Sequence, residues 1–276
     1  MLDRLRLLGA TAAVASLLVC GPAVHRLVAQ SFDSLQSPET ERFLIEAPMK
    51  LGETLGGVTR SRKATLALNG VSHFAVWKTI DDNRKGVTNL GQGGYEINFR
   101  DTWKNEVPAY ELDKMLGLKM VPVAVSRTFQ NKEGALIAWV DLGMSEGERL
   151  KKQLIPPNPA DWSQKMANVQ LFDNLIYNID RHVNNIYITK DWNVILIDHS
   201  RAFRSFNELR AENDLRRFSK SLLEGLEKLD RPTVQKKMSK YLEGGQIDAL
   251  FARRDAILAR ARRLVKEQGE AAVLFP

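Results

Sequence analysis

The chain of 276 residues is poor in the two residue types that most often build metal and redox sites. It has one cysteine, Cys20, which cannot form an internal disulfide and leaves no thiol for the rest of the chain. The four histidines (His25, His73, His182 and His199) have no zinc-ligand spacing, and no internal repeat is visible. These absences exclude a disulfide framework, a zinc site and thiol catalysis.

The charge is only moderately one-sided. The formal net charge is +7, and the basic residues are spread along the chain, which is typical of a solvated surface. The most basic stretch, within a predicted helix over residues 246–268, also carries an apolar stripe, so we interpret it as a core-facing terminal helix. No nucleic-acid partner is expected.

The first 29 residues have the layout of a secretory signal. Two arginines precede an uncharged run over residues 7–24, and small residues follow it. The alternative is an uncleaved membrane anchor, because the run approaches the ~20 residues that a span needs. Gly21-Pro22 interrupts the run and favours cleavage. Either way the body of the protein is expected to be exported, as a periplasmic or secreted protein or held at the membrane by this segment alone.

The rest of the chain predicts an α+β protein with two lobes. Residues 30–50 are expected to form a connector, residues 51–144 a sheet-rich lobe with one helix, and residues 145–276 a mainly helical lobe. In the first lobe, residues 51–80 predict a three-stranded meander with a turn at Asn69-Gly70, and residues 81–98 a glycine-rich loop. The other predicted elements are a helix from Asp101 to Leu116 ended by Gly117, strands at 120–129 and 134–143, a helix at 161–177, a hairpin at 180–198, and helices after 207.

The hairpin "NIDRHVNNIYITKDWNVILIDHS" carries carboxylates and carboxamides at its base. A four-residue loop at 190–193 would pair Ile186 with Ile197 and place Asn185 opposite Asp198. A carboxylate and a carboxamide at this place offer the oxygen ligands that Mg²⁺ accepts beside phosphates. The alternative is a loop in which these side chains cap their own backbone.

Two further charged residues lie on apolar faces. Strand alternation puts Lys78 on the face of Phe74 and Val76, and helical spacing puts Glu106 on that of Trp103 and Tyr110. Because a lone charge is costly to bury, we predict that Lys78 and Glu106 pair with each other. An ordinary partly buried salt bridge would explain both residues without any chemistry.

In order along the chain, these residues match the parts of a protein-kinase-like phosphotransferase. The pattern D-R-H-x-x-N at 180–185, followed by I-D at 197–198, resembles that of phosphoinositide kinases. It resembles more closely the secretory-pathway kinases of the four-jointed and Golgi casein kinase class, a likeness that spans about residues 53–206. The segments that carry it are "NEVPAYELDKMLGLKMVPVAV", "FDNLIYNIDRH" and "IDHSRAF".

The resemblance implies roles for the residues of the hairpin region. Asp180 would be the catalytic residue that orients or deprotonates the acceptor hydroxyl, and Asn185 and Asp198 would hold Mg²⁺ or Mn²⁺. Arg181 and His182 would support the loop, with His182 as base the alternative.

The resemblance also implies a nucleotide site in the first lobe, for ATP or another nucleotide. Lys78 would bind its phosphates and Glu106 would position Lys78, while Gly56, Gly57 and Thr59 would form the turn over the phosphates. That turn departs from the pattern, because "LGGVTRSRK" is not G-x-G-x-x-G.

The expected function is that of an exported atypical kinase that transfers the γ-phosphate of a nucleotide to a protein or glycan hydroxyl. Two alternatives stay open: a catalytically inactive kinase-like scaffold that binds a partner, and nucleotidyl (AMP) transfer from the same site. The acceptor, whether protein, glycan or small molecule, is not specified by the sequence.

Overall fold

The computed structural model describes residues 26–27, 31–56, 60–91, 94–141 and 143–276. Apart from Arg26 and Leu27, the predicted signal segment lies outside these residues. Within the part of the chain that is described, no helix has both the length and the apolar character needed to cross a membrane.

A sheet that is antiparallel except for one short parallel pair forms most of the first lobe. Its order is β2 (Met49–Thr54), β3 (Arg62–Leu68), β4 (Val71–Lys78), β8 (Lys132–Ala138) and β7 (Ala124–Phe129), with the short β1 (Arg26–Leu27) beside β4. The β3–β4 turn has positive φ at both Asn69 and Gly70, the conformation that the Asn-Gly pair favours. The predicted meander and the two later strands are confirmed.

The segment predicted as a connector, residues 30–50, is structured instead. It contains the 3₁₀ helix η1 (Asp33–Gln36) and helix α1 (Pro38–Glu46), and β2 begins at Met49. Ser37 caps α1 with its side chain and Pro38 occupies the first turn, both standard helix-start signals. Leu44 is buried against the sheet, so α1 belongs to the lobe.

The glycine-rich stretch predicted as a loop over 81–98 is a long hairpin of β5 (Asp81–Gly91) and β6 (Gly94–Thr102). Gly86 and Gly91 have positive φ and lie where the strand register shifts, so they allow the irregularities of the ladder. Asp101 is the penultimate residue of β6, so it does not cap the next helix. Instead, the 3₁₀ helix η2 (Trp103–Asn105) leads into α2 (Glu106–Leu116), which Gly117 ends as predicted.

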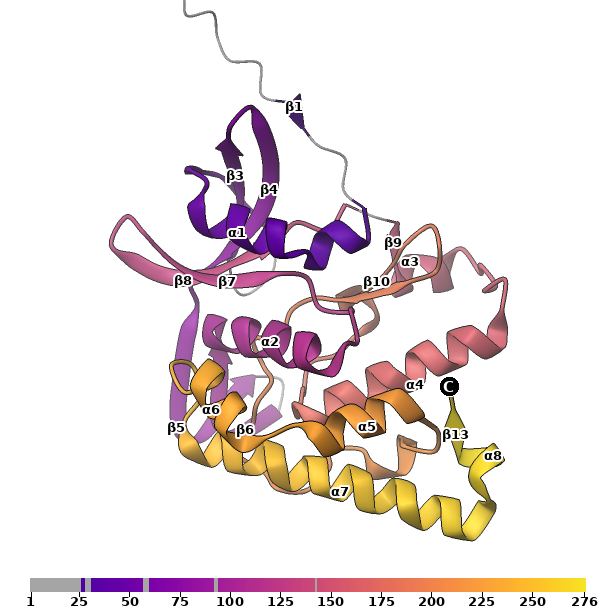
Figure 1. Ribbon diagram of the computed structural model, residues 1–276. Coiled ribbons are helices and arrows are strands. Elements are labelled where there is room, and N and C mark those ends of the chain that lie inside the picture. Colours follow the sequence, from indigo (N-terminus) through magenta and orange to yellow (C-terminus); the bar gives the residue numbers. More distant parts are fainter. Residues whose placement is uncertain (1–25, 28–30, 57–59, 92–93, 142) are drawn as a thin grey trace, which may run out of the picture.

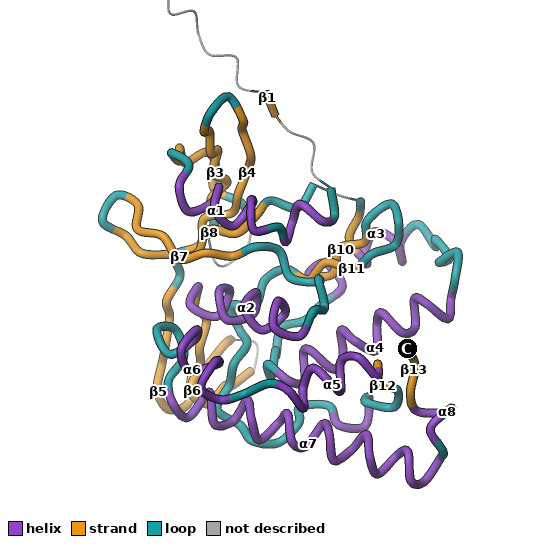
Figure 2. The backbone as a smooth tube through the Cα atoms, in the orientation of Figure 1, coloured by secondary structure: helices purple, strands orange, loops and turns teal. Residues whose placement is uncertain are grey.

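The second lobe is mainly helical, as predicted (Figure 2). Its elements in chain order are β9 (Met144–Ser145), α3 (Glu146–Lys151), α4 (Pro159–Leu175), η3 (Val183–Asn185), β10 (Ile186–Ile188), β11 (Val194–Leu196), η4 (Glu212–Asp214), β12 (Phe218–Ser219), α5 (Lys220–Lys228), α6 (Arg231–Met238), α7 (Gly244–Gln268), α8 (Glu270–Val273) and β13 (Leu274–Phe275). Asn158, three residues before Asp161, caps α4, and Gly244-Gly245 form the first turn of α7.

The sheet lies above α2 and the helical lobe below it (Figure 1). One hydrophobic core runs through all three: Leu66 of the sheet, Leu112 of α2 and Leu250 of α7 belong to the same cluster of buried side chains. The α+β, two-lobed architecture is therefore confirmed, and the lobes meet around α2 and the β10–β11 hairpin.

Candidate active site

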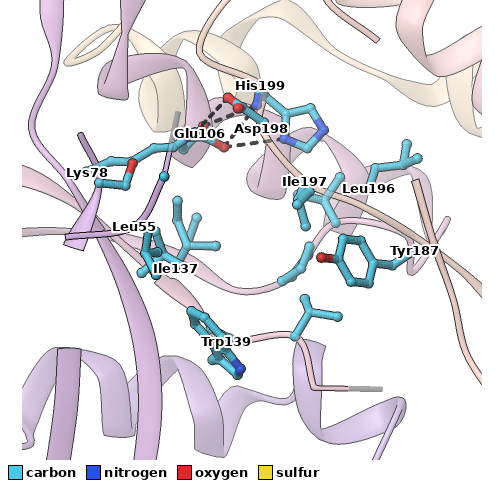
Figure 3. A pocket seen from close by; sticks show the side chains of 18 residues that line it. Leu55, Lys78, Glu106, Ile137, Trp139, Tyr187, Leu196, Ile197, Asp198 and His199 are labelled. Carbon is cyan, nitrogen blue, oxygen red and sulfur yellow. Dashed lines mark hydrogen bonds and ion pairs between the residues drawn. The ribbon is translucent and has the colours of Figure 1, made fainter. Parts of the chain in front are cut away.

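A cavity of about 310 Å³ lies between the sheet and the β10–β11 hairpin. Apolar side chains line most of it, among them Leu55, Ile137, Trp139, Tyr187 and Leu196 (Figure 3). Polar side chains gather at one end: Lys78 from the end of β4, Glu106 from the start of α2, and Asp198 and His199 from just after β11. Four predicted site residues line this cavity (Gly56, Lys78, Glu106 and Asp198), whereas Asp180 and Asn185 do not.

Lys78 is the centre of the polar end. Its side chain is buried, and Nζ lies 2.6 Å from Oε1 of Glu106 and 2.7 Å from Oδ1 of Asp198. Burial alone would lower the pKa of Lys78, but the two carboxylates hold it above its usual value. Burial alone would raise the pKa of Glu106, but the positive charge of Lys78 outweighs this effect, so the pKa of Glu106 is lowered. The predicted Lys78–Glu106 ion pair is confirmed.

The β10–β11 register differs by one residue from the prediction. Ile186 pairs with Leu196 and Ile188 with Val194, because the connection has five residues instead of four. Trp192 has positive φ, and Thr189 accepts the N–H of Asn193 through its hydroxyl, which stabilises the longer turn.

This register changes the surroundings of the two predicted metal ligands. Asn185 lies opposite Ile197, whose N–H donates to the Asn185 carbonyl at 3.1 Å, and not opposite Asp198. Asp198 comes one residue later, with a φ of 59° that takes it out of the ladder and into the cavity. The Asn185 side chain is buried, and its Nδ2 donates to the Asp180 carbonyl at 3.3 Å.

Arg181 fastens the loop after Asp180 to the hairpin. Its Nη1 donates to the carbonyls of Asn185, at 3.0 Å, and Ile197, at 2.6 Å, and its Nε pairs with Asp173 on α4. Such a buried guanidinium fork holds the base of both hairpin strands against α4. The placement agrees with the predicted support role of Arg181.

Asp180 and His182 are exposed beside this support. The backbone N–H of Asp180 donates to the Asn178 side chain at 3.1 Å. The Asp180 carboxylate forms no hydrogen bond or ion pair with any of the described residues. His182 accepts the N–H of Asn184 through Nδ1, so it serves as a local cap. Asp180 is thus held by its backbone and leaves its carboxylate free.

Two residues that were not among the predicted site residues support the site. Asn105 is fully buried, and its Nδ2 donates to the carbonyls of Ser200 and Ala202 at 2.8 and 2.9 Å. The His199 N–H donates to both oxygens of Glu106, at 3.1 and 3.2 Å, and burial lowers the pKa of the His199 ring. The sequence offered no signal for Asn105, because the residue stands in a polar stretch with Asp101, Thr102 and Lys104.

The predicted turn over the phosphates is described only in part. Gly56 lines the cavity, and a Cβ built on it meets no atom within 4 Å. The Leu55 N–H donates to the Ser61 carbonyl at 2.7 Å, which closes the turn. Gly57 and Thr59 lie outside the described residues.

The donor set suits a hard cation beside phosphates. Nowhere in the described ranges do three His, Cys, Asp or Glu side chains converge as a metal cage. The Asp198 side chain is one-third exposed at the cavity, unlike Glu106, which is 3% exposed. One carboxylate and one carboxamide leave the remaining ligand positions to phosphate and water, which is how Mg²⁺ is usually bound. Asn185 and Asp198 thus fit such an ion in chemical type.

Comparison with solved structures identifies the fold. Hydra Fam20 with sugar superposes with a TM-score of 0.64 at 16% identity over 91% of this chain and 95% of that one. This chain has an atypical, secretory-kinase-like fold. The Golgi casein kinase gives a TM-score of 0.59 at 16% identity, over 86% of this chain and 78% of that one. The Golgi casein kinase with Mn/ADP bound gives a TM-score of 0.58 at 16% identity, over 88% of this chain and 78% of that one.

At the level of sequence the likeness is weak. No protein-family model matches the chain, and no curated protein matches it. The resemblance to the Golgi casein kinase class is therefore confirmed as a shared fold, and its residue roles stay predictions.

Proposed function

We propose that this protein is an exported phosphotransferase that uses a nucleotide with Mg²⁺ or Mn²⁺ and transfers a phosphoryl group to a hydroxyl of a protein or glycan. The observation that carries the proposal is the Lys78–Glu106–Asp198 cluster at the polar end of a mostly apolar cavity, in a kinase-like fold. That a structural neighbour has Mn/ADP bound supports the choice of nucleotide and metal. Export rests on the N-terminal segment.

The three cluster residues, together with Asn185 at the base of the hairpin, have distinct parts in the proposal. Asn185 and Asp198 would hold the divalent ion, whose charge neutralises the nucleotide phosphates. Lys78 would bind a phosphate oxygen, and Glu106, desolvated and held by the His199 N–H, would keep the ammonium group in place. Asp198 is more exposed than Glu106, so it is the partner that can leave Lys78 for the ion.

Asp180 would act on the acceptor. It is exposed and its carboxylate is free, while its backbone is held through Asn178 and Asn185. A fixed backbone with a free carboxylate suits a group that must accept a hydrogen bond from an incoming hydroxyl. Asp180 would orient that hydroxyl and take its proton as the oxygen–phosphorus bond forms.

Nucleotide binding is tested first by thermal unfolding of the purified chain with ATP and Mn²⁺, each protein compared with its own ligand-free state. A ligand that binds only the folded state raises the unfolding temperature. We expect a shift in the wild type and in Asp191→Ala, an exposed carboxylate in the hairpin turn, and its loss in Asp198→Ala.

Incubation with γ-labelled and with α-labelled ATP then identifies the reaction. Label transferred from the γ-position in the wild type, and lost in Asp180→Ala, supports a kinase. Transfer from the α-position would show nucleotidyl transfer instead. Absence of any nucleotide-induced shift would reject the enzyme and leave a kinase-like scaffold.

A further inference from the structure

A second cavity, of about 820 Å³, lies away from the candidate active site and shares no lining residue with it. Its lining comes mainly from the β5–β6 hairpin, the segment 203–206 and the segment 239–246 that leads into α7. The β5–β6 hairpin and the start of α7 lie at the lower left of Figure 1. Its walls carry six cationic side chains (Arg84, Lys85, Arg100, Lys104, Arg204 and Lys240) and one carboxylate, Glu243.

Four of the six cations have carboxylate partners that are not part of the lining. The pairs are Arg84–Asp82 at 2.6 Å, Lys104–Asp81 at 2.7 Å, Lys240–Glu133 at 2.8 Å and Arg204–Glu96 at 2.8 Å. Lys85 is exposed and pairs with none of the described residues. The lining therefore keeps an excess of positive charge, because Glu243 is the one carboxylate of the lining near Arg100 and Lys85 has no partner among the described residues.

Among the cations of the lining that pair with a carboxylate, Arg100 has the longest contact. Its side chain is 17% exposed, and its nearest carboxylate, that of Glu243, lies 3.4 Å away. Its Nε is buried and has no hydrogen-bond partner within the described structure. Burial lowers the pKa of the neighbouring Arg204, Glu96 opposes that shift, and the charges of Arg201 and Arg100 add to it. An anion between these guanidinium groups would accept a hydrogen bond from the Arg100 Nε and would offset the repulsion between Arg100 and Arg204.

We propose that this basic cavity binds a small organic anion that carries phosphate or carboxylate groups. A guanidinium fork matches either group. The positive end of the 25-residue helix α7 lies at the same wall, because its N-cap residue Glu243 and Gln246 of its first turn line the cavity. Phe99, Phe203 and Tyr241 supply apolar walls for the body of the ligand, and the volume is that of a small-molecule site.

The test measures binding to the full chain by calorimetry, without divalent metal, using fructose 1,6-bisphosphate, inorganic pyrophosphate and citrate as probes. Loss of two charged contacts in Lys85→Gln/Arg100→Gln should weaken binding by about tenfold or more. The control Lys132→Gln/Lys190→Gln removes the same charge from exposed sites elsewhere and should keep wild-type affinity.

A third variant works in the opposite direction. Glu243→Gln removes the carboxylate of the lining and keeps an oxygen that can accept the helix-capping hydrogen bond, so the anion should bind several-fold more tightly. This gain does not depend on whether the double variant folds well.

The outcomes distinguish an anion site in this cavity from binding elsewhere and from no binding. Binding that falls in the double variant and rises in Glu243→Gln establishes the site, and preference for the phosphorylated probes or for citrate identifies the anionic group. Absence of binding by all three probes at millimolar concentration overturns the proposal. So does equal affinity in the double variant and its control, which would place the anion elsewhere, for example at Lys78.

Discussion

Lys78 is a cation shared by two carboxylates that differ in their access to solvent. Glu106 is 3% exposed and accepts the His199 N–H besides Lys78, whereas Asp198 is 33% exposed and faces the cavity. A buried carboxylate without a counter-charge is costly, so Glu106 depends on Lys78 for stability, while Asp198 can exchange it for another cation. The same ammonium group thus holds the fold and leaves one carboxylate available for ligands.

Replacing Lys78 by methionine should therefore lower stability in a pH-dependent way. At neutral pH, Lys78→Met leaves Glu106 buried and unpaired, and we expect a loss of about 3 kcal/mol in the free energy of unfolding. Without the ammonium group, burial raises the pKa of Glu106, so protonation at lower pH removes part of the cost. Urea unfolding at acidic and neutral pH measures both effects, with Lys132→Met as the exposed control. A deficit that does not shrink in acid would contradict this account.

At the scale of the element, α2 connects the site at both of its ends. Its first residue is Glu106, and near its end Asp113 is fully buried and accepts the Met120 N–H at 3.0 Å. The Met120 carbonyl accepts the N–H of Leu196 at 2.8 Å, on the strand that leads to Asp198. The helix therefore positions Glu106 directly and β11 through the loop after Gly117.

Asp113 predicts a pH dependence for this connection. Burial raises its pKa to about 7, against the lowering effect of backbone N–H groups of residues 119–121. The folded chain then binds this proton more tightly than the unfolded chain, whose carboxyl has a pKa of about 3.9. Its contribution is full below about pH 4 and is lost as the pH rises to about 7, by at most about 1.4 kcal/mol per pH unit.

The comparison with Asp113→Asn isolates this effect. The asparagine cannot ionise but can still accept the Met120 N–H. Urea unfolding across this pH range should show the wild type losing stability relative to the variant as the pH rises. The buried His199, whose lowered pKa gives the opposite slope, is present in both proteins and cancels. Parallel stability curves would refute the assignment.

At the scale of the whole molecule, the two lobes share their apolar interior. The same cluster of buried side chains includes Leu66 of the sheet, Leu112 of α2, Phe172 of α4 and Leu250 of α7. Neither lobe can separate without exposing part of it, and exposed apolar area costs roughly 25 cal/mol per Å². We therefore expect the lobes to unfold together.

The five tryptophans allow a direct test. Trp77, Trp103 and Trp139 lie in the first lobe, and Trp162 and Trp192 in the second. In Trp162→Phe/Trp192→Phe, fluorescence follows the first lobe alone, while far-UV circular dichroism follows mainly the helices of the second. The two urea transitions should coincide. Separate midpoints would show that the lobes unfold independently.

The sequence alone determined the features that depend on neighbours within a few residues. Asn69-Gly70 specified a turn and Gly117 a helix end, because their backbone conformations are restricted locally. The sequence also predicted the ion pair between Lys78 and Glu106, because each is a charged residue on an apolar face. Local rules failed where the role of a glycine was ambiguous, as in the β5–β6 hairpin, where Gly86 and Gly91 lie at register shifts of a ladder and not in a loop.

Only the tertiary structure decided which distant groups meet. Strands of three residues carry too little pattern to determine register, so the one-residue offset that places Asn185 opposite Ile197 follows from the turn and from the Arg181 fork. The contact of Lys78 with Asp198, 120 residues later, exists because the shared core brings β4, α2 and β11 together. The second, basic cavity likewise arises from three elements that no sequence spacing relates, since their approach is set by long-range packing and not by local propensity.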